Sequence, residues 1–206
     1  MDLLLTEVFP MITISLLAYY FTTYSRILTS SCIISLSYLF IKSLVYFRNN
    51  SSASRAIVVR RYIHSLIVTL LAIIPIHCIF IAFGAALFEN KTETLVLSFT
   101  VSILTVLPCT FSFRINYRYF ISKLLLLELY SLEELDLVVQ VYSVCVCVWM
   151  SAFPILLDWD KPWQKWPIPC LAGTWIGYSC SKIISFILHS MDISRKFTHR
   201  SYSLLS

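Results

Sequence analysis

Long apolar segments, separated by short polar connections, constrain the fold of this chain more than any other feature. An α-helix needs about 20 mostly apolar residues to cross the hydrocarbon core of a bilayer. Of the 206 residues, 58% are hydrophobic, so the chain lacks the polar surface that a soluble domain of this size requires. We therefore predict an all-α, polytopic membrane protein, in which residues 1–206 form a single six-helix transmembrane domain. The six predicted spans are approximately residues 3–21, 27–47, 62–83, 94–113, 135–157 and 168–188.

Two segments need a separate interpretation. The residues that begin the first span include Asp2 and Glu7 but no Lys or Arg. A cleaved signal peptide begins with basic residues, so we expect this span to be retained. Residues 114–134 mix Arg, Lys and Glu with a leucine-rich stretch. That pattern is typical of a helix that lies along the membrane surface rather than across it.

The distribution of Lys and Arg predicts the orientation of the spans. With six spans, the 48–61 loop, the 114–134 segment and the C-terminal tail share the side of the N-terminus and carry ten Lys and Arg residues, and the connections on the other side carry four. Cytoplasmic loops of membrane proteins are enriched in these residues, so both termini should be cytoplasmic. The loops at 84–93 and 158–167 should then face the lumen or the exterior. The net charge of +5 does not indicate nucleic-acid binding, because its distribution between the loops is what reports orientation.

No set of residues in the sequence is typical of a catalytic centre, a metal site or a cofactor site. His77 is predicted to lie within the membrane, where an ionisable residue is a functional candidate. A neutral histidine that is hydrogen-bonded to a neighbouring helix is the favoured alternative. The other three histidines fall near the opposite side of the membrane, so they cannot join His77 around a metal. The seven cysteines lie in or beside apolar segments, which indicates buried thiols rather than a disulfide framework.

Four residues are predicted to act in helix packing: Gly84, Pro108, Gly173 and Gly177. The last two form a G-x-x-x-G pattern in the sixth span, which places two small residues on one helix face and allows another backbone to approach closely. The approaching helix could belong to this chain, which is favoured, or to another subunit.

The segment 154–169, PILLDWDKPWQKWPIP, gathers four of the seven prolines and three of the five tryptophans. Three interpretations are open for its central loop, residues 158–167, which we call the signature loop. Its tryptophans could anchor a hairpin at the membrane interface. Asp158 and Asp160 form a D-x-D pattern, which in sugar transferases helps to hold a metal. The loop could also recognise a partner or a glycolipid headgroup. The recognition candidates are Asp158, Trp159, Asp160, Lys161, Pro162, Trp163, Gln164, Trp166 and Pro167.

The run DWDKPWQKWPI at 158–168, with a following glycine pair and tyrosine, closely resembles the signature of the phosphatidylinositol-glycan biosynthesis class F family. That family's loop reads LDWERPWQ-x-WP, and here Asp160 and Lys161 keep the charges of its Glu and Arg. Two weaker matches lie upstream. The run from His77 to Ala85 resembles the family's FH-x-IF…YGAP, although Ala86 replaces the proline, and TVLPC at 105–109 resembles TTVPC.

This resemblance implies a multi-pass protein of the endoplasmic-reticulum membrane that acts in GPI-anchor assembly. It implies an accessory or stabilising subunit of the large ethanolamine-phosphate transferase that adds phosphoethanolamine to mannose of the GPI precursor. The implied partners are that multi-pass transferase and, in addition, the GPI precursor or phosphatidylethanolamine. Two alternatives stay open: an enzyme that uses Asp158, Asp160 and His77 on a lipid headgroup, and a transporter of phosphatidylethanolamine.

Overall fold

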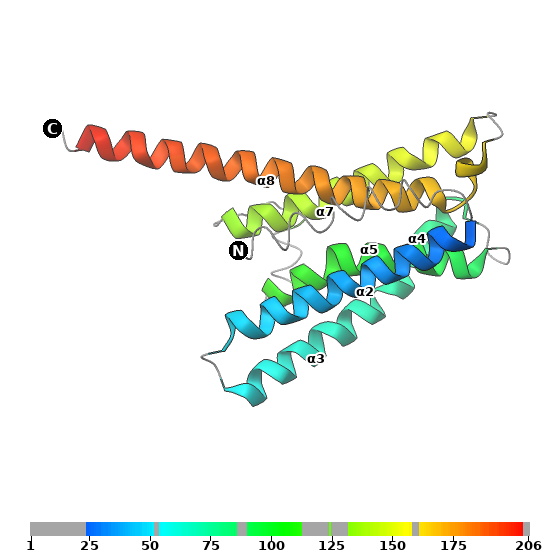
Figure 1. Ribbon diagram of the computed structural model, residues 1–206, viewed down its shortest axis with the longest axis horizontal. Helices are drawn as coiled ribbons and strands as arrows, with labels where there is room; N and C mark the ends of the chain where they lie inside the picture. The colour runs from blue at the N-terminus through cyan, green and yellow to red at the C-terminus, as the bar shows by residue number, and fades with distance from the viewer. Residues whose placement is uncertain are drawn as a thin grey trace.

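A computed structural model describes residues 24–51, 54–85, 90–112, 124, 132–157 and 161–203. These residues form six α-helices, two 3-10 helices and no strand, which confirms the all-α prediction for this part of the chain (Figure 1). The elements are α2 (Tyr24–Asn49), α3 (Arg55–Leu71), α4 (Ile73–Ala82), α5 (Lys91–Ser112), α7 (Leu132–Ala152), η1 (Phe153–Leu156), η2 (Pro162–Gln164) and α8 (Ile168–Ser203).

Five segments are long and apolar enough to cross a membrane. They overlap the last five predicted spans, and the predicted span at 3–21 lies outside the described residues. So does most of the surface helix predicted for 114–134, although its last three residues already belong to α7. The five segments are Ile27–Asn49, Arg55–Ala82, Lys91–Ser112, Leu132–Leu156 and Ile168–Met191.

Helix α5 is the centre of the bundle and contacts α2, α3, α4, α7 and α8. In the most apolar stretch of α5, 67% of the residues are buried, whereas the corresponding share for the α3–α4 segment is 11%. Its leucines Leu97, Leu104 and Leu107 are fully buried and pack in one core with Trp175 and Tyr178 of α8. A helix that is surrounded by protein in this way fixes the positions of its neighbours, and so of the loops at their ends.

The third predicted span, 62–83, is two helices rather than one. Helix α3 ends at Leu71, and α4 begins at Ile73. Pro75 has no backbone N–H and its ring would clash with the carbonyl of Leu71, four residues earlier. The break at Ala72 is therefore the local consequence of Pro75, and it lets α4 take its own direction on α5.

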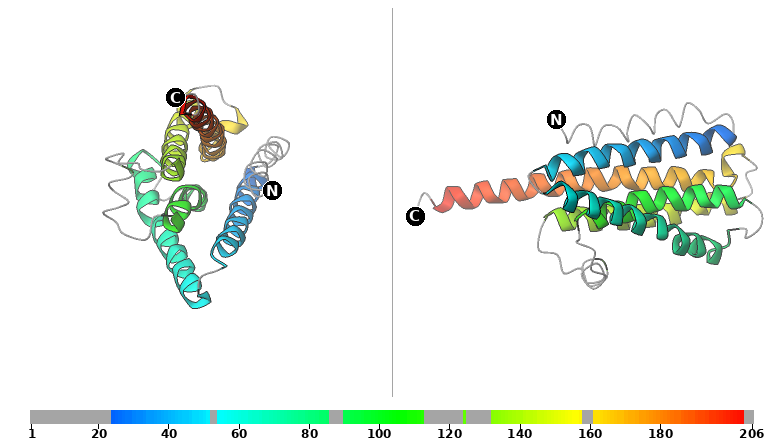
Figure 2. Two further views of the ribbon diagram at one scale, coloured as in Figure 1. Left: turned by 90° about the vertical axis from the view of Figure 1, so that its left-hand side faces the viewer. Right: turned by 90° about the horizontal axis from the view of Figure 1, so that it is seen from below.

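The connections gather at the two ends of the bundle, as Figures 1 and 2 show. One end, which we call the loop end, carries the start of α2, the end of α4, the start of α5 and the η1–η2 hairpin. The other end carries the α2–α3 connection, the end of α5 and the start of α7. Helices α7 and α8 run antiparallel side by side, and α8 continues past the other helices (Figure 2).

Candidate functional site

The signature loop lies at the loop end between η1 and α8, and the structure describes its residues from Lys161 onward. Asp158, Trp159 and Asp160 lie outside the described residues, so the role suggested by the D-x-D pattern stays a prediction from the sequence. In the described part, the side chains of Lys161 and Lys165 are exposed and that of Trp163 is half-buried.

Gln164 holds the loop together from inside. Its side-chain amide donates to the carbonyl oxygens of Pro154 (2.7 Å) and Leu157 (2.6 Å). Its Oε1 accepts the backbone N–H of Lys161 (2.8 Å). A glutamine amide offers two donors and one acceptor oxygen, and all three functions are used here. Through Gln164, these bonds connect Leu157 to Lys161, the two described residues on either side of 158–160.

The structure therefore places the Gln164 side chain inside the loop rather than on its exposed surface, where a recognition residue was expected. Only 9% of the residue is exposed, and its partners all belong to this chain. The sequence pattern could not separate Gln164 from the lysines beside it, because a polar residue in a loop is usually exposed. The geometry gives it the role of positioning the loop.

Trp166 ties the loop to α4 and α5. Its Nε1–H donates to Thr94 Oγ1 at 2.9 Å, and Thr94, at the start of α5, is 1% exposed. The Thr94 hydroxyl in turn donates to the carbonyl of Asn90 (3.0 Å). The indole also meets the ring of Phe80 edge-on, with 6.3 Å between centroids. A tryptophan with an indole hydrogen bond and a ring contact is fixed at both its polar and its apolar part.

The glycine pair of α8 faces α7 of the same chain. A Cβ on Gly173 would lie 2.7 Å from the carbonyl oxygen of Cys147 and would also overlap the side chain of Ser151. A Cβ on Gly177 would lie 2.6 Å from the carbonyl oxygen of Ser143. Real side chains do not approach backbone so closely, so glycine at both positions is what lets α7 and α8 touch. Of the two interpretations of the G-x-x-x-G pattern, the geometry supports packing within the chain.

Pro108, within α5, explains a polar contact that the sequence did not predict. Because proline has no N–H, the carbonyl of Leu104 loses its helical hydrogen bond. Gln140 of α7 supplies the missing donor, with its Nε2 2.6 Å from the Leu104 oxygen. Gln140 is only 2% exposed. The signal that could have found it is a lone amide in an apolar span, opposite a proline-containing helix.

His77 of α4 points to α5, where its Nδ1 lies 3.4 Å from Ser98 Oγ. This is the contact with a neighbouring helix that the favoured alternative for His77 predicts, although the distance is long for a hydrogen bond.

The surroundings of Gly84 differ from the close helix packing that was predicted for it. No described atom lies within 4 Å of a Cβ built there, but its φ is +103°, a conformation that favours glycine. The backbone turn after α4, and not helix packing, accounts for this glycine.

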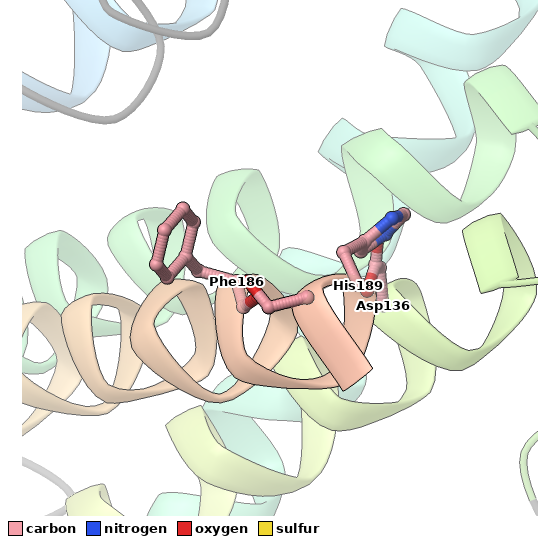
Figure 3. Close-up of polar contacts among 4 residues, drawn as sticks. Asp136, Phe186 and His189 are labelled. Carbon is pink, nitrogen blue, oxygen red and sulfur yellow. The ribbon is translucent and has the colours of Figure 1, made fainter. Parts of the chain in front are cut away.

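The end of the bundle opposite the signature loop holds a hydrogen-bond contact between α7 and α8. His189 Nε2 lies 2.8 Å from Asp136 Oδ2, and Figure 3 shows the two side chains together beside α8. The sequence placed His189 near this end but gave no partner for it, because the partner is 53 residues away. Within the described ranges, no group of three His, Cys, Asp or Glu side chains could hold a metal ion.

Comparisons with known proteins identify the family of the chain. The sequence model of the GPI biosynthesis protein family Pig-F matches residues 2–186. A mouse protein named "GPI ethanolamine phosphate transferase, stabilizing subunit" is 32% identical over 150 residues, which are 73% of this chain and 67% of the mouse protein. The human protein of the same name is 34% identical over 56% of this chain and 53% of its own length.

A fungal relative, "Glycosylphosphatidylinositol anchor biosynthesis protein 11" of Yarrowia lipolytica, is 35% identical over 48% of this chain and 42% of its own. The matched part is thus only about half the length of two of these three relatives. No solved structure matches the chain. The family match covers nearly all of the chain, including the signature loop and both glycines, and this chain belongs to the Pig-F family of GPI biosynthesis proteins.

Proposed function

We propose that this chain is the stabilising, non-catalytic subunit of an ethanolamine phosphate transferase that adds phosphoethanolamine to mannose of the GPI precursor. The observation that carries the proposal is the similarity to the mouse and human proteins that are named stabilizing subunits of this transferase. In this proposal the catalytic groups belong to a large multi-pass partner, and this chain holds that partner in the membrane.

The geometry of the loop end supports a role in recognition. Gln164 and Trp166 connect residues 161–167 of the signature loop to η1, α4 and α5, so this part of the loop has a defined position. Preorganised loops bind with a smaller entropy cost than loops that must be ordered on binding. We assign the contact with the partner to Asp158, Trp159, Asp160, Lys161 and Trp163. Gln164 and Trp166 position these residues.

The sidedness of the protein follows from the charge pattern. The loop end carries few Lys and Arg residues in sequence, so it should lie in the lumen of the endoplasmic reticulum, with both termini in the cytoplasm. Phosphoethanolamine is added to a glycan, and a lumenal loop end would place the signature loop on the side of the membrane where that transfer occurs.

The test is complementation of cells that lack this chain. Trp163→Ala and Gln164→Leu should lower both the abundance of the large transferase subunit and the addition of phosphoethanolamine to the GPI precursor. Phe40→Ala is the control, because Phe40 is an exposed aromatic residue in α2, away from the loop. If both loop variants restore the partner and the product fully, the signature loop is not the recognition surface. Transfer by the purified chain alone would contradict the non-catalytic role.

A further inference from the structure

Four exposed arginines gather where α2 ends and α3 begins, at the end of the bundle opposite the signature loop (Figure 1). We call them the arginine tip: Arg48, Arg55, Arg60 and Arg61. No Asp or Glu occurs between Glu7 and Glu89, so α2, α3 and α4 contain no carboxylate that could neutralise the tip. Among the described residues, none forms an ion pair with Arg55, Arg60 or Arg61. The tip therefore presents a concentrated positive charge at one end of the bundle.

The length of the α3–α4 segment places these arginines at the depth of the lipid headgroups. Arg55–Ala82 has 28 residues, and about 20 are enough to cross the hydrocarbon core. Residues 62–82 already supply that length, and they include no Lys, Arg, Asp or Glu. The first two turns of α3, which carry three of the four arginines, then lie in the headgroup layer. Arg48, in the last turn of α2, lies at the same end of its own span.

An aromatic cluster holds the two sides of the tip together. The ring of Tyr46 stacks on Phe111 of α5 with 4.6 Å between centroids, and Phe47 packs on Tyr62 of α3 at 4.9 Å. The hydroxyls of Tyr62 and Ser43 are hydrogen-bonded at 2.8 Å. These contacts join α2, α3 and α5, so the arginine-bearing ends of α2 and α3 are held beside each other. Tyrosine favours the membrane interface, which agrees with the depth that the length of the segment gives.

The residue types around the tip indicate which kind of partner fits it. Ile57 and Val59 are exposed on the same two turns as the arginines. A soluble acidic protein or a nucleic acid would leave these apolar side chains in water. At a bilayer they reach the acyl region, while the guanidinium groups reach the phosphates.

The choice of arginine over lysine points to phosphate. All four basic residues of the tip are Arg. The orientation of a membrane protein requires only positive charge, which Lys supplies as well. A guanidinium adds a planar pair of donors that matches two phosphate oxygens at once. The tip therefore has a chemistry that orientation alone does not require.

We propose that the arginine tip binds the headgroups of anionic phospholipids in the leaflet at this end of the bundle. The guanidinium groups donate to the phosphate oxygens, and Ile57 and Val59 contact the adjoining part of the acyl chains. Phosphatidylcholine fits less well, because its choline cation is repelled by the tip. This inference goes beyond the proposed function and does not depend on it, since the tip and the signature loop lie at opposite ends of the bundle.

The test measures lipid binding to the purified full chain by native mass spectrometry. The chain, in detergent micelles, is supplied with equal amounts of phosphatidylserine and phosphatidylcholine that have the same acyl chains. Phosphatidylserine should be the more abundant bound lipid. Arg60→Gln should lower the ratio of bound phosphatidylserine to bound phosphatidylcholine about fivefold, the effect of one basic residue near an anionic membrane. Arg60→Lys should lower it less, because it keeps the charge.

A second variant and a control with the same loss of charge complete the design. Arg55→Gln should also lower the ratio, and Lys165→Gln, at an exposed position of the signature loop, should leave it unchanged. Equal falls for Arg60→Gln and Lys165→Gln would show a response to overall charge, and that result would overturn the proposal. So would an unchanged ratio in both arginine variants. If these variants keep the lipid ratio but lose a co-purifying acidic protein, the tip is a protein-docking surface and the proposal is wrong. The measurement needs no transferase, so a failure here does not touch the proposed function.

Discussion

Replacement of Gln140 tests how α5 and α7 are joined. Gln140→Leu keeps a side chain of similar size but removes the amide that donates to the Leu104 carbonyl. Loss of one partner from a buried hydrogen bond costs about 1–3 kcal/mol in soluble proteins. Hydrogen bonds between membrane helices average about 0.6 kcal/mol and reach about 1.7 kcal/mol. Because Pro108 has already removed the helical partner of Leu104, we expect the upper part of that range, about 1.5 kcal/mol.

A second substitution isolates the contribution of Pro108. Pro108→Ala restores a backbone N–H that can bond to Leu104, so Gln140→Leu should cost much less in that background. The double-mutant cycle should show a coupling of about 1 kcal/mol. The free energy of unfolding is measured in mixed micelles by circular dichroism as the fraction of SDS increases. If the two substitutions are simply additive, Pro108 is not the reason why the Leu104 carbonyl depends on Gln140.

Two further predictions use the same unfolding measurement. Gly177→Ala should destabilise the chain by about 1–3 kcal/mol, because the added Cβ would overlap the α7 backbone. This cost should exceed the gain of about 1 kcal/mol that alanine brings as the better helix former. The control is Ala172→Leu, at a half-buried position of α8, which should cost less. Trp166→Phe and Thr94→Val should each cost about 0.5–1.5 kcal/mol. Their combination should cost less than the sum of the two, because they share the Trp166–Thr94 hydrogen bond, although Thr94→Val also removes the bond to the Asn90 carbonyl; full additivity would contradict this.

The sequence predicted the large features because they depend on local composition. Apolar runs gave the approximate positions of five helical segments that the structure describes, and the spacing of Gly173 and Gly177 placed both on one face of α8. Pro75 could also have predicted the break at Ala72. It was missed because the predicted span was defined by hydropathy alone, which does not register a proline.

The missed features depend on how distant segments meet. The contact of Gln140 with Leu104 requires the relative positions of α5 and α7 along their axes, and the contact of His189 with Asp136 requires those of α7 and α8. Neither relative position can be predicted from the residues near Gln140 or His189 in the sequence. Gln164 was assigned to the loop surface for the same reason, because only the folded hairpin brings the Pro154 carbonyl to its amide.

The most direct test of the account is purification of the tagged full chain from native membranes, followed by identification and quantification of the proteins that remain bound. We expect a large multi-pass ethanolamine phosphate transferase to co-purify in a fixed ratio, and we expect its abundance to fall when the gene for this chain is deleted. If the chain purifies without any such transferase, and deletion leaves the transferase abundance and the phosphoethanolamine content of GPI precursors unchanged, the stabilising role is contradicted.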